Sequence, residues 1–297
     1  MGRWNIRWSV LLVLWCVTGV KLAAMKVESL DRGWFFNRGY ESQAADKVTV
    51  DLPHTWNAAD AMFGNVNYYR GMSTYSRFNV VPSSENFKRV FLRIKAAQTV
   101  ADVYLDNHFV VQHKGGYTSF TIELTPFIRR GEKQKLDIRV SNAQTMEIAP
   151  ICGDFNIWGG LNRGVELLFT DSACIDPTFY GSSGVFFTQY NVSEKYAGLE
   201  MKALLSGTEM ALNDCSIEFS LLDAKHKVVS CKEISVSGKE AVVKMELDNP
   251  HLWDGVNDPY LYTGIVVLKR GSKEIDRREE HVGFRFYSGR DREHKKG

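Results

Sequence analysis

The feature that most constrains the fold is a succession of short β-type segments. Alternating or β-branched runs recur along almost the whole chain after its first two dozen residues, and turn residues separate them. In "VADVYLDNHFVVQH", for example, two such runs flank a turn at Asp106 and Asn107. Only two stretches are candidates for short helices, "HTWNAADAM" and "LTPFIRRG". Because strands do not alternate with long helices, the chain is predicted to be all-β and built from sandwiches.

A turn-rich break, "FTDSACIDPTFYGSSG", divides the strands into two sets. The boundary is predicted near residue 173. Residues 25–172 fit a jelly roll of about eight strands, an architecture shared by many lectin domains. Residues 173–287 match the size of an immunoglobulin-like sandwich of about 100 residues. The remaining residues, 288–297, are predicted to be a charged, solvated tail.

The first 24 residues have the pattern of a secretory signal peptide. Arg3 and Arg7 precede the apolar run "SVLLVLWCVTGV", and Ala23 and Ala24 are small residues at which a signal peptidase can cut. The run is shorter than the roughly 20 apolar residues of a membrane span, so no stable span is expected. The mature chain is therefore predicted to begin near Met25 and to be periplasmic or secreted.

The five cysteines predict neither a lipid anchor nor a metal site. Cys16 follows the bulky Trp15, where lipidation requires a small residue, so anchoring there is not expected. The other four are Cys152, Cys174, Cys215 and Cys231. None forms a CxxC pair, and no His lies at a zinc-like spacing from them. Cys215 and Cys231 flank two neighbouring predicted strands, which leaves a disulfide and two small buried thiols as alternatives.

The charge balance excludes several classes of partner. Lys and Arg number 37 against 35 Asp and Glu, which gives a net charge of +2. So small a charge does not create the field that binding to nucleic acid or a membrane surface needs. The chain also lacks a Ser-His-Asp pattern, a phosphate-binding Gly loop and a nucleotide fingerprint, so no cofactor is predicted.

One loop concentrates residues suited to a carbohydrate. The stretch "GDFNIWGGLNRGVELLF" places Asp154, Phe155, Trp158 and Arg163 close together before a hydrophobic strand. Aromatic rings stack on the apolar faces of sugars, while carboxylates and amides bind hydroxyl groups with directed hydrogen bonds. In the alternative interpretation, Trp158 and Phe155 cap a core and Asp154 pairs with Arg163.

A second stretch, "LPHTWNAADAMFGNVNYYRG", has a similar composition. His54 and Trp56 precede a polar loop that contains Asn57, Asn65 and Asn67. A single histidine in such a place is more often structural than catalytic.

The order of motifs resembles glycoside hydrolase family 2, the β-galactosidase and β-glucuronidase family. The resemblance covers nearly the whole mature chain and is carried by "LPHTW", "YYRG", "VYLDNHFVVQHKGGYTSF", "WGGLNRGVEL", "PHLWDGVNDPYLYTGIVVL" and "GFRFY". It implies a sugar-binding jelly roll, an immunoglobulin-like domain and then a catalytic (β/α)8 barrel.

The resemblance also implies where catalysis takes place. Retaining glycosidases of this family use two barrel glutamates about 5 Å apart. After "GFRFYS" this chain continues only as "GRDREHKKG", so we expect a truncated, non-catalytic portion with no catalytic residue of its own. Glu123, Glu166 and Glu246 lie in strand patterns and are predicted to be exposed strand positions.

The same resemblance assigns substrate-positioning roles in the jelly roll. It implies that Asn65 and Asp154 reach the sugar pocket at the barrel mouth, with Asn67 as an alternative to Asn65, and Trp158 completes the predicted substrate-binding set. The partner is then a β-linked glycan, bound together with the missing barrel, and the oligomeric state is not predicted. A free-standing carbohydrate-binding module and an adhesion sandwich without a sugar site are the competing hypotheses.

Overall fold

The structure is a computed structural model that describes residues 25–39, 48–58, 60, 68–78, 80, 87–149 and 156–286. The predicted signal peptide, the charged tail, Asn65, Asn67, Cys152, Asp154 and Phe155 lie outside the described residues. Almost all regular structure in the described part is strand, which confirms the all-β prediction. In that part, no helix is long and apolar enough to cross a bilayer.

The first half of the chain folds as a sandwich of two main antiparallel sheets. One sheet has the strand order β1-β12-β6-β9, the other β3-β2-β5-β10-β7-β8, and β4 pairs with β11 in a small third sheet. The strands are β1 (Lys26–Ser29), β2 (Trp34–Arg38), β3 (Val48–Val50), β4 (His54–Thr55), β5 (Met72–Phe78), β6 (Arg89–Ile94), β7 (Val100–Leu105), β8 (His108–Lys114), β9 (Phe120–Glu123), β10 (Lys135–Ser141), β11 (Gly160–Leu161) and β12 (Val165–Thr170). This two-sheet architecture is that of the predicted jelly-roll sandwich.

Alternation along these strands builds a closed core between the sheets. In β7 every second residue is buried, because successive side chains point to opposite faces of a sheet. Trp34 and Tyr75 are fully buried and meet edge to face, with ring centroids 6.4 Å apart. The core of this half runs from Leu30 to Phe169. The turn between β7 and β8 uses Asp106 and Asn107 at φ 48° and 63°, the left-handed conformation that these residue types tolerate.

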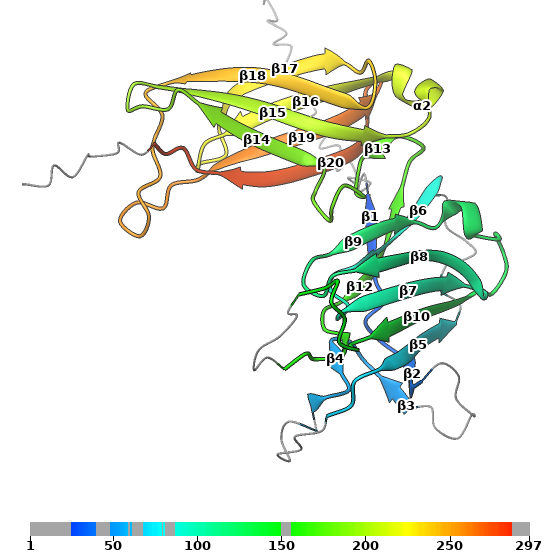
Figure 1. Cartoon of the computed structure of the whole chain (residues 1–297). Coiled ribbons are helices and arrows are strands. Elements are labelled where there is room, and N and C mark those ends of the chain that lie inside the picture. The colour runs from blue at the N-terminus through cyan, green and yellow to red at the C-terminus, as the bar shows by residue number, and fades with distance from the viewer. Residues whose placement is uncertain are drawn as a thin grey trace, which may run out of the picture.

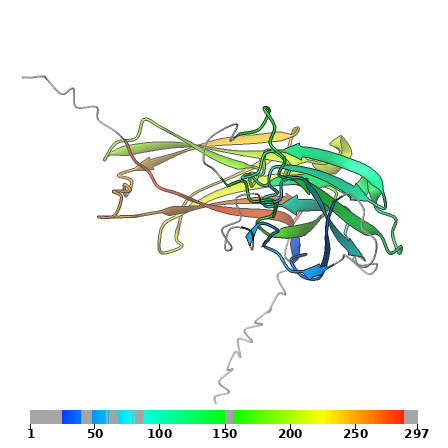
Figure 2. The same cartoon turned by 60° about the horizontal axis from the view of Figure 1, so that its bottom comes forward.

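The second half forms another sandwich. One sheet contains β13, β15, β14 and β18, and the other has the order β17-β16-β19-β20. The strands are β13 (Cys174–Ile175), β14 (Val185–Tyr190), β15 (Tyr196–Ser206), β16 (Cys215–Leu222), β17 (Val228–Ser235), β18 (Glu240–Asp248), β19 (Tyr262–Arg270) and β20 (Lys273–Val282). Its separate core runs from Ala173 to Phe284. The two sandwiches are distinct bodies in Figure 1, and they overlap in the turned view of Figure 2.

Two local expectations differ from the structure. The stretch "LTPFIRRG" contains only the 3-10 turn η2 (Thr125–Phe127), whereas in "HTWNAADAM" Ala58 and Asp60 are helical and residues 59, 61 and 62 lie outside the described residues. A helix that the strand pattern did not predict, α2 (Glu209–Asn213), follows β15. The Thr208 side chain caps it by accepting a hydrogen bond from the Ala211 amide at 3.3 Å.

The cysteines of the second sandwich are free thiols. In β16 and β17, Cys231 is opposite Ser220, five residues along the strand from Cys215. At about 3.3 Å per residue this register holds the two cysteines too far apart for a disulfide. Cys215 is buried and Cys231 is exposed. The alternative of a small buried thiol is therefore confirmed for Cys215 and wrong for Cys231.

Polar contacts connect the two sandwiches where β13 follows β12. The Arg270 guanidinium lies 2.8 Å from the Asp171 carboxylate, and the Ile175 amide donates to the Asp276 carboxylate at 2.8 Å. Asp276 is fully buried and also pairs with Arg278, which is only 8% exposed. These charged and backbone contacts attach the linker to β19 and β20 of the second sandwich.

Candidate functional site

The small sheet of β4 and β11 brings the two candidate stretches together. His54 pairs with Leu161 and Thr55 with Gly160, although about a hundred residues separate these positions along the chain. The Thr55 hydroxyl donates to the Gly159 carbonyl at 2.8 Å. The start of the polar loop after Trp56 and the end of the loop before β11 therefore lie together at one edge of the first sandwich.

A buried pair of amide side chains, Asn57 and Asn142, holds these loops together. They are 1% and 0% exposed, and Asn142 Nδ2 donates to Asn57 Oδ1 at 3.1 Å. Asn142 Nδ2 also donates to the Ile157 carbonyl at 2.9 Å, while Asn57 Oδ1 accepts from the Gly159 amide at 2.8 Å. Because buried polar groups need partners, the pair fixes the backbone of the second loop.

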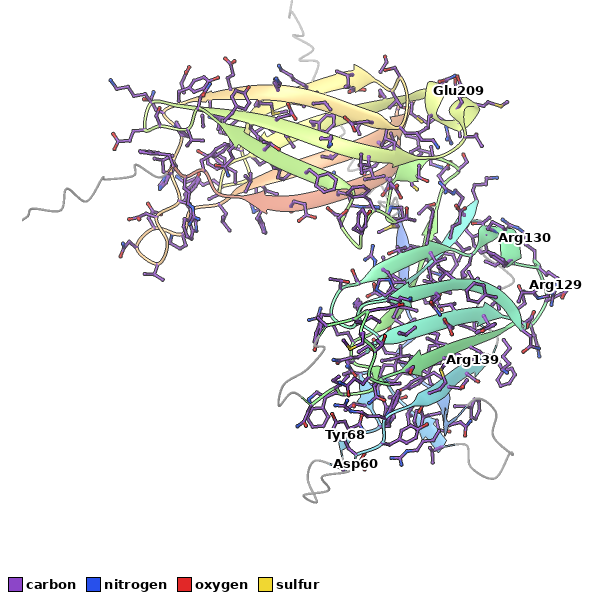
Figure 3. The ribbon with its side chains drawn as sticks, in the orientation of Figure 1. Asp60, Tyr68, Arg129, Arg130, Arg139 and Glu209 are labelled. Atoms are coloured by element: carbon purple, nitrogen blue, oxygen red, sulfur yellow. The ribbon has the colours of Figure 1, made fainter. Side chains whose placement is uncertain are left out.

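The same pair fixes the first loop. Asn57 Nδ2 donates to the Tyr69 carbonyl at 2.9 Å and to the Asp60 carboxylate at 3.1 Å. Asp60 also accepts from the Tyr69 amide at 3.3 Å, and Asn142 Oδ1 accepts from the Gly71 amide at 2.9 Å. Figure 3 shows Asp60 near Tyr68 at the end of the first sandwich that is remote from the second.

Direct contact joins the described flanks of the two loops. The Ile157 amide donates to the Tyr68 hydroxyl at 3.2 Å, and Arg70 also donates to that oxygen. Arg70 lies over the Tyr68 ring, 5.0 Å from its centroid. The chain segments that lead to Asn65 and to Asp154 therefore start side by side.

Of the three predicted substrate-binding residues, the structure describes only Trp158. Its side chain is half-buried, and it is not a member of the core cluster that the described residues of this half form. Its carbonyl accepts from Asn162 Nδ2 at 3.1 Å. A half-exposed indole outside the core is available to stack on a sugar, in contrast to Trp56, which is buried in the core.

His54 has the contacts of a structural residue. Its Nδ1 lies 2.8 Å from the hydroxyl of the buried Tyr75, and its ring packs on Phe36 with centroids 4.7 Å apart. Burial lowers the pKa of His54 and raises that of Tyr75, so both groups are neutral at pH 7.

The strand glutamates are scaffold residues. Glu246 is exposed, as predicted, but Glu123 and Glu166 are half-buried and ion-paired. The Arg89 guanidinium binds both oxygens of Glu123 at 2.9 and 2.6 Å and lowers the pKa of that carboxyl. The prediction of exposed positions was wrong for these two, because a pattern of alternation does not reveal a cation on the neighbouring strand.

Hydrogen bonding and stacking are the chemistry that this edge offers. Within the described network the amides of Asn57 and Asn142 are buried and hydrogen-bonded, and the one carboxylate, Asp60, is used internally. The part-exposed Tyr68 and Trp158 are therefore the side chains of this network that a ligand can reach. In the described part of the chain, no group of three or more His, Cys, Asp and Glu residues is arranged to hold a metal ion. The arrangement therefore suits the positioning of a polyhydroxylated ligand.

Sequence reasoning missed Asn142. The residue follows β10 in "VSNAQT", where an asparagine is ordinary turn chemistry, and its partner Asn57 is 85 residues away. No local signal marks it as the centre of the site's scaffold.

Family models and relatives agree with this arrangement. The sugar binding domain of the glycosyl hydrolases family 2 matches residues 27–171, and a second model, glycosyl hydrolases family 2, matches residues 184–285. A beta-glucuronidase from Bacteroides fragilis is 36% identical over 87% of this chain and 37% of its own length. A beta-galactosidase from Thermoanaerobacter pseudethanolicus is 27% identical over 82% of this chain and 32% of its own length.

Solved structures show the same fold. Beta-glucuronidase 2 from Bacteroides uniformis superimposes with a TM-score of 0.78 at 27% identity, covering 88% of this chain and 33% of that one. The beta-glucuronidase from Parabacteroides merdae gives 0.77 at 25% identity, covering 88% and 35%. The chain thus spans about two fifths or less of the length of these relatives, and the matched part is their N-terminal portion.

Proposed function

Because the chain belongs to glycoside hydrolase family 2 through its sugar-binding and immunoglobulin-like domains, we propose that it serves as the substrate-positioning part of a β-glycosidase. In this role it binds no cofactor and breaks no bond. Asp154, Asn65 and Trp158 orient the hydroxyl groups of a β-linked sugar, and two glutamates of a barrel carry out the hydrolysis. The relatives named beta-glucuronidase and beta-galactosidase make aryl β-glucuronides and β-galactosides the first substrates to test.

The observation that carries the proposal is the joining of the two loops. The buried pair Asn57 and Asn142 and the contact from Ile157 to Tyr68 hold together the segments that flank Asn65 and Asp154. Such rigid support is what a positioning site requires, because errors of about 1 Å in substrate position slow catalysis strongly.

The first test is turnover by the purified chain on aryl β-galactosides and β-glucuronides. We expect none, because the proposed function places the carboxylate pair in a barrel. Turnover that is abolished when a glutamate of this chain is changed to glutamine contradicts the proposal.

The second test examines Asp154. The chain is fused or combined with a family barrel to give an active enzyme, and Asp154→Ala is compared with the parent. The expected result is a large loss of kcat/KM with an unchanged unfolding temperature, and Asn65→Ala and Trp158→Ala should raise KM. Asp171→Ala is a matched control, since Asp171 is bound to Arg270 at the other side of the sandwich. Unchanged kinetics for Asp154→Ala make that residue part of the scaffold.

Export is a further part of the proposal, supported by the pattern of the first 24 residues. When the chain is expressed with these residues in a bacterium, the protein should appear in the periplasm or medium, and N-terminal sequencing should find a start near Met25. Retention of Met1 in a cytoplasmic product contradicts it.

Saturable glycan binding by the isolated chain favours the alternative of a free-standing carbohydrate-binding module.

A further inference from the structure

A cleft between the two sandwiches has features that the proposed function does not use. It has a volume of about 550 Å³, within the range of about 300–1,000 Å³ that small-ligand sites have. The first sandwich contributes one wall, and the loop before β14 together with β20 contributes the other. Its lining includes the cations Arg93, Lys95, Arg163 and Arg278 and the aromatic residues Tyr117 and Tyr180.

Positive charge dominates this lining. Four of the lining residues are Arg or Lys and none is Asp or Glu. Behind the wall, Glu166 pairs with both Lys95 and Arg93, the latter at 3.7 Å, and Asp276 pairs with Arg278. Two carboxylates therefore face four cations, and the cleft keeps an excess of positive charge.

Two of the cations differ in how they are held. Arg163 is exposed, lines the cleft and has no hydrogen-bond or ion-pair partner among the described residues. Arg93 is partly buried, and burial lowers its pKa; Glu166 opposes this change, and the nearby charge of Arg278 adds to it. An anion bound beside Arg93 would offset this repulsion from Arg278.

The rest of the lining is suited to a sugar ring. Thr118, Ser182 and Ser183 provide hydroxyl groups, and the side chains of Tyr117 and Tyr180 are 59% and 87% exposed. The Tyr117 hydroxyl accepts from Gln98 Nε2 at 3.0 Å, which fixes the ring while its face stays open.

The cleft lies next to the loop that carries Trp158. Gln98 Oε1 accepts from Asn162 Nδ2 at 3.0 Å, and the same Asn162 nitrogen donates to the Trp158 carbonyl at 3.1 Å. A short chain of hydrogen bonds thus connects Tyr117 in the cleft to Trp158 at the proposed sugar site.

We propose that this cleft is a second binding site, which takes the anionic group of an acidic saccharide on Arg93, Lys95 and Arg163 with the sugar ring against Tyr117. The anion is a uronate carboxylate or a sulfate. Both groups carry negatively charged oxygens that accept paired hydrogen bonds from a guanidinium group. The site goes beyond the proposed function, because it needs neither the barrel nor Asp154.

The experiment titrates the full chain with glucuronic acid, glucose 6-sulfate and glucose, and follows binding by calorimetry or saturation-transfer NMR. We expect Kd values of about 1–10 mM for one or both acidic sugars and at least about fivefold weaker binding of glucose. The stronger of the two acidic sugars identifies the carboxylate or the sulfate as the preferred anion.

Two variants assign the binding to the cleft. Arg163→Gln should weaken binding of the acidic sugar about fivefold, as expected for the loss of one exposed charge contact. Lys273→Gln removes an exposed charge at the β19–β20 turn and should change nothing. Circular dichroism confirms that each variant is folded.

Several results overturn the inference. They are equal affinity for glucose and the acidic sugars, the absence of saturable binding, and an equal loss of affinity in Lys273→Gln. A glutamate-rich peptide that binds at Arg163 while both acidic sugars fail would instead identify the cleft as a docking surface for an acidic protein segment.

Discussion

Gly159 has a neighbourhood that allows no side chain, and Gly159→Ala tests the scaffold of the site. A Cβ at this position would lie 2.0 Å from Cζ2 of Trp56 and 2.8 Å from Cγ of Asn142. Trp56 is 4% exposed and stacks on Phe36 with centroids 6.0 Å apart, so its ring cannot swing into solvent without opening the core. The loop must therefore move away from the sandwich.

The expected cost follows from these contacts. Overpacking of a filled core costs about 1–3 kcal/mol. Movement of the loop also breaks the bond from the Gly159 amide to Asn57, and a buried hydrogen bond that is lost costs about 1–3 kcal/mol. We expect Gly159→Ala to lower the free energy of unfolding of the first sandwich by about 2–5 kcal/mol.

Urea unfolding followed by tryptophan fluorescence measures this change. Trp34, Trp56 and Trp158 report on the first sandwich, and Trp253 reports on the second, whose transition should not shift. Gly131→Ala is the matched control: its Cβ would have no neighbour within 4 Å, and φ is +81°, so only the left-handed strain of about 1–2 kcal/mol applies. The reasoning is refuted if Gly159→Ala destabilises the first sandwich no more than Gly131→Ala does.

Three further predictions concern single contacts. Asn142→Leu should destabilise the first sandwich by about 2–4 kcal/mol in the same assay, because it leaves the Gly71 amide and the Ile157 carbonyl without their partner. A decrease in the free energy of unfolding of less than about 1 kcal/mol would contradict the role given to the amide pair. Arg89 lowers the pKa of Glu123, so this ion pair stabilises the fold above the ordinary glutamate pKa. Its contribution disappears as the pH falls below that ordinary value and through the lowered pKa, and acid unfolding of Glu123→Gln should lack this component. The third prediction uses a chain in which Cys16 and Cys152 are replaced by serine. A thiol reagent should modify the exposed Cys231 rapidly and Cys174 only on unfolding, because burial raises the pKa of the Cys174 thiol to about 12. Rapid reaction of two or more thiols would contradict this.

Periodicity predicted the strands well because burial in a sandwich alternates along each strand. In β18 (Glu240–Asp248) every second residue is buried, and the sequence "KEAVVKMEL" shows the same alternation. The helix α2 (Glu209–Asn213) escaped prediction because five residues between two strands are too short for a helical period to appear.

Contacts between distant segments could not be predicted from the sequence. The amide pair of Asn57 and Asn142 depends on the meeting of β4 with β11, which no local pattern specifies. The cleft cations likewise come from separate segments: Arg93 lies in β6 and Arg278 in β20, and they approach each other because the two sandwiches meet there. Composition identified the residues suited to a sugar, while tertiary structure decides which of them are free to touch one.

The pairing of β1 with β12 delays the folding of the first sandwich during synthesis. Val27 lies opposite Leu168, so the first strand to leave the ribosome waits for a partner made about 140 residues later. At roughly 5–20 residues per second this delay lasts on the order of 10 s, during which the sheet of β12, β6 and β9 cannot close. Nascent chains shorter than about 170 residues should therefore remain sensitive to protease and should depend on chaperones that cover β1 and β6.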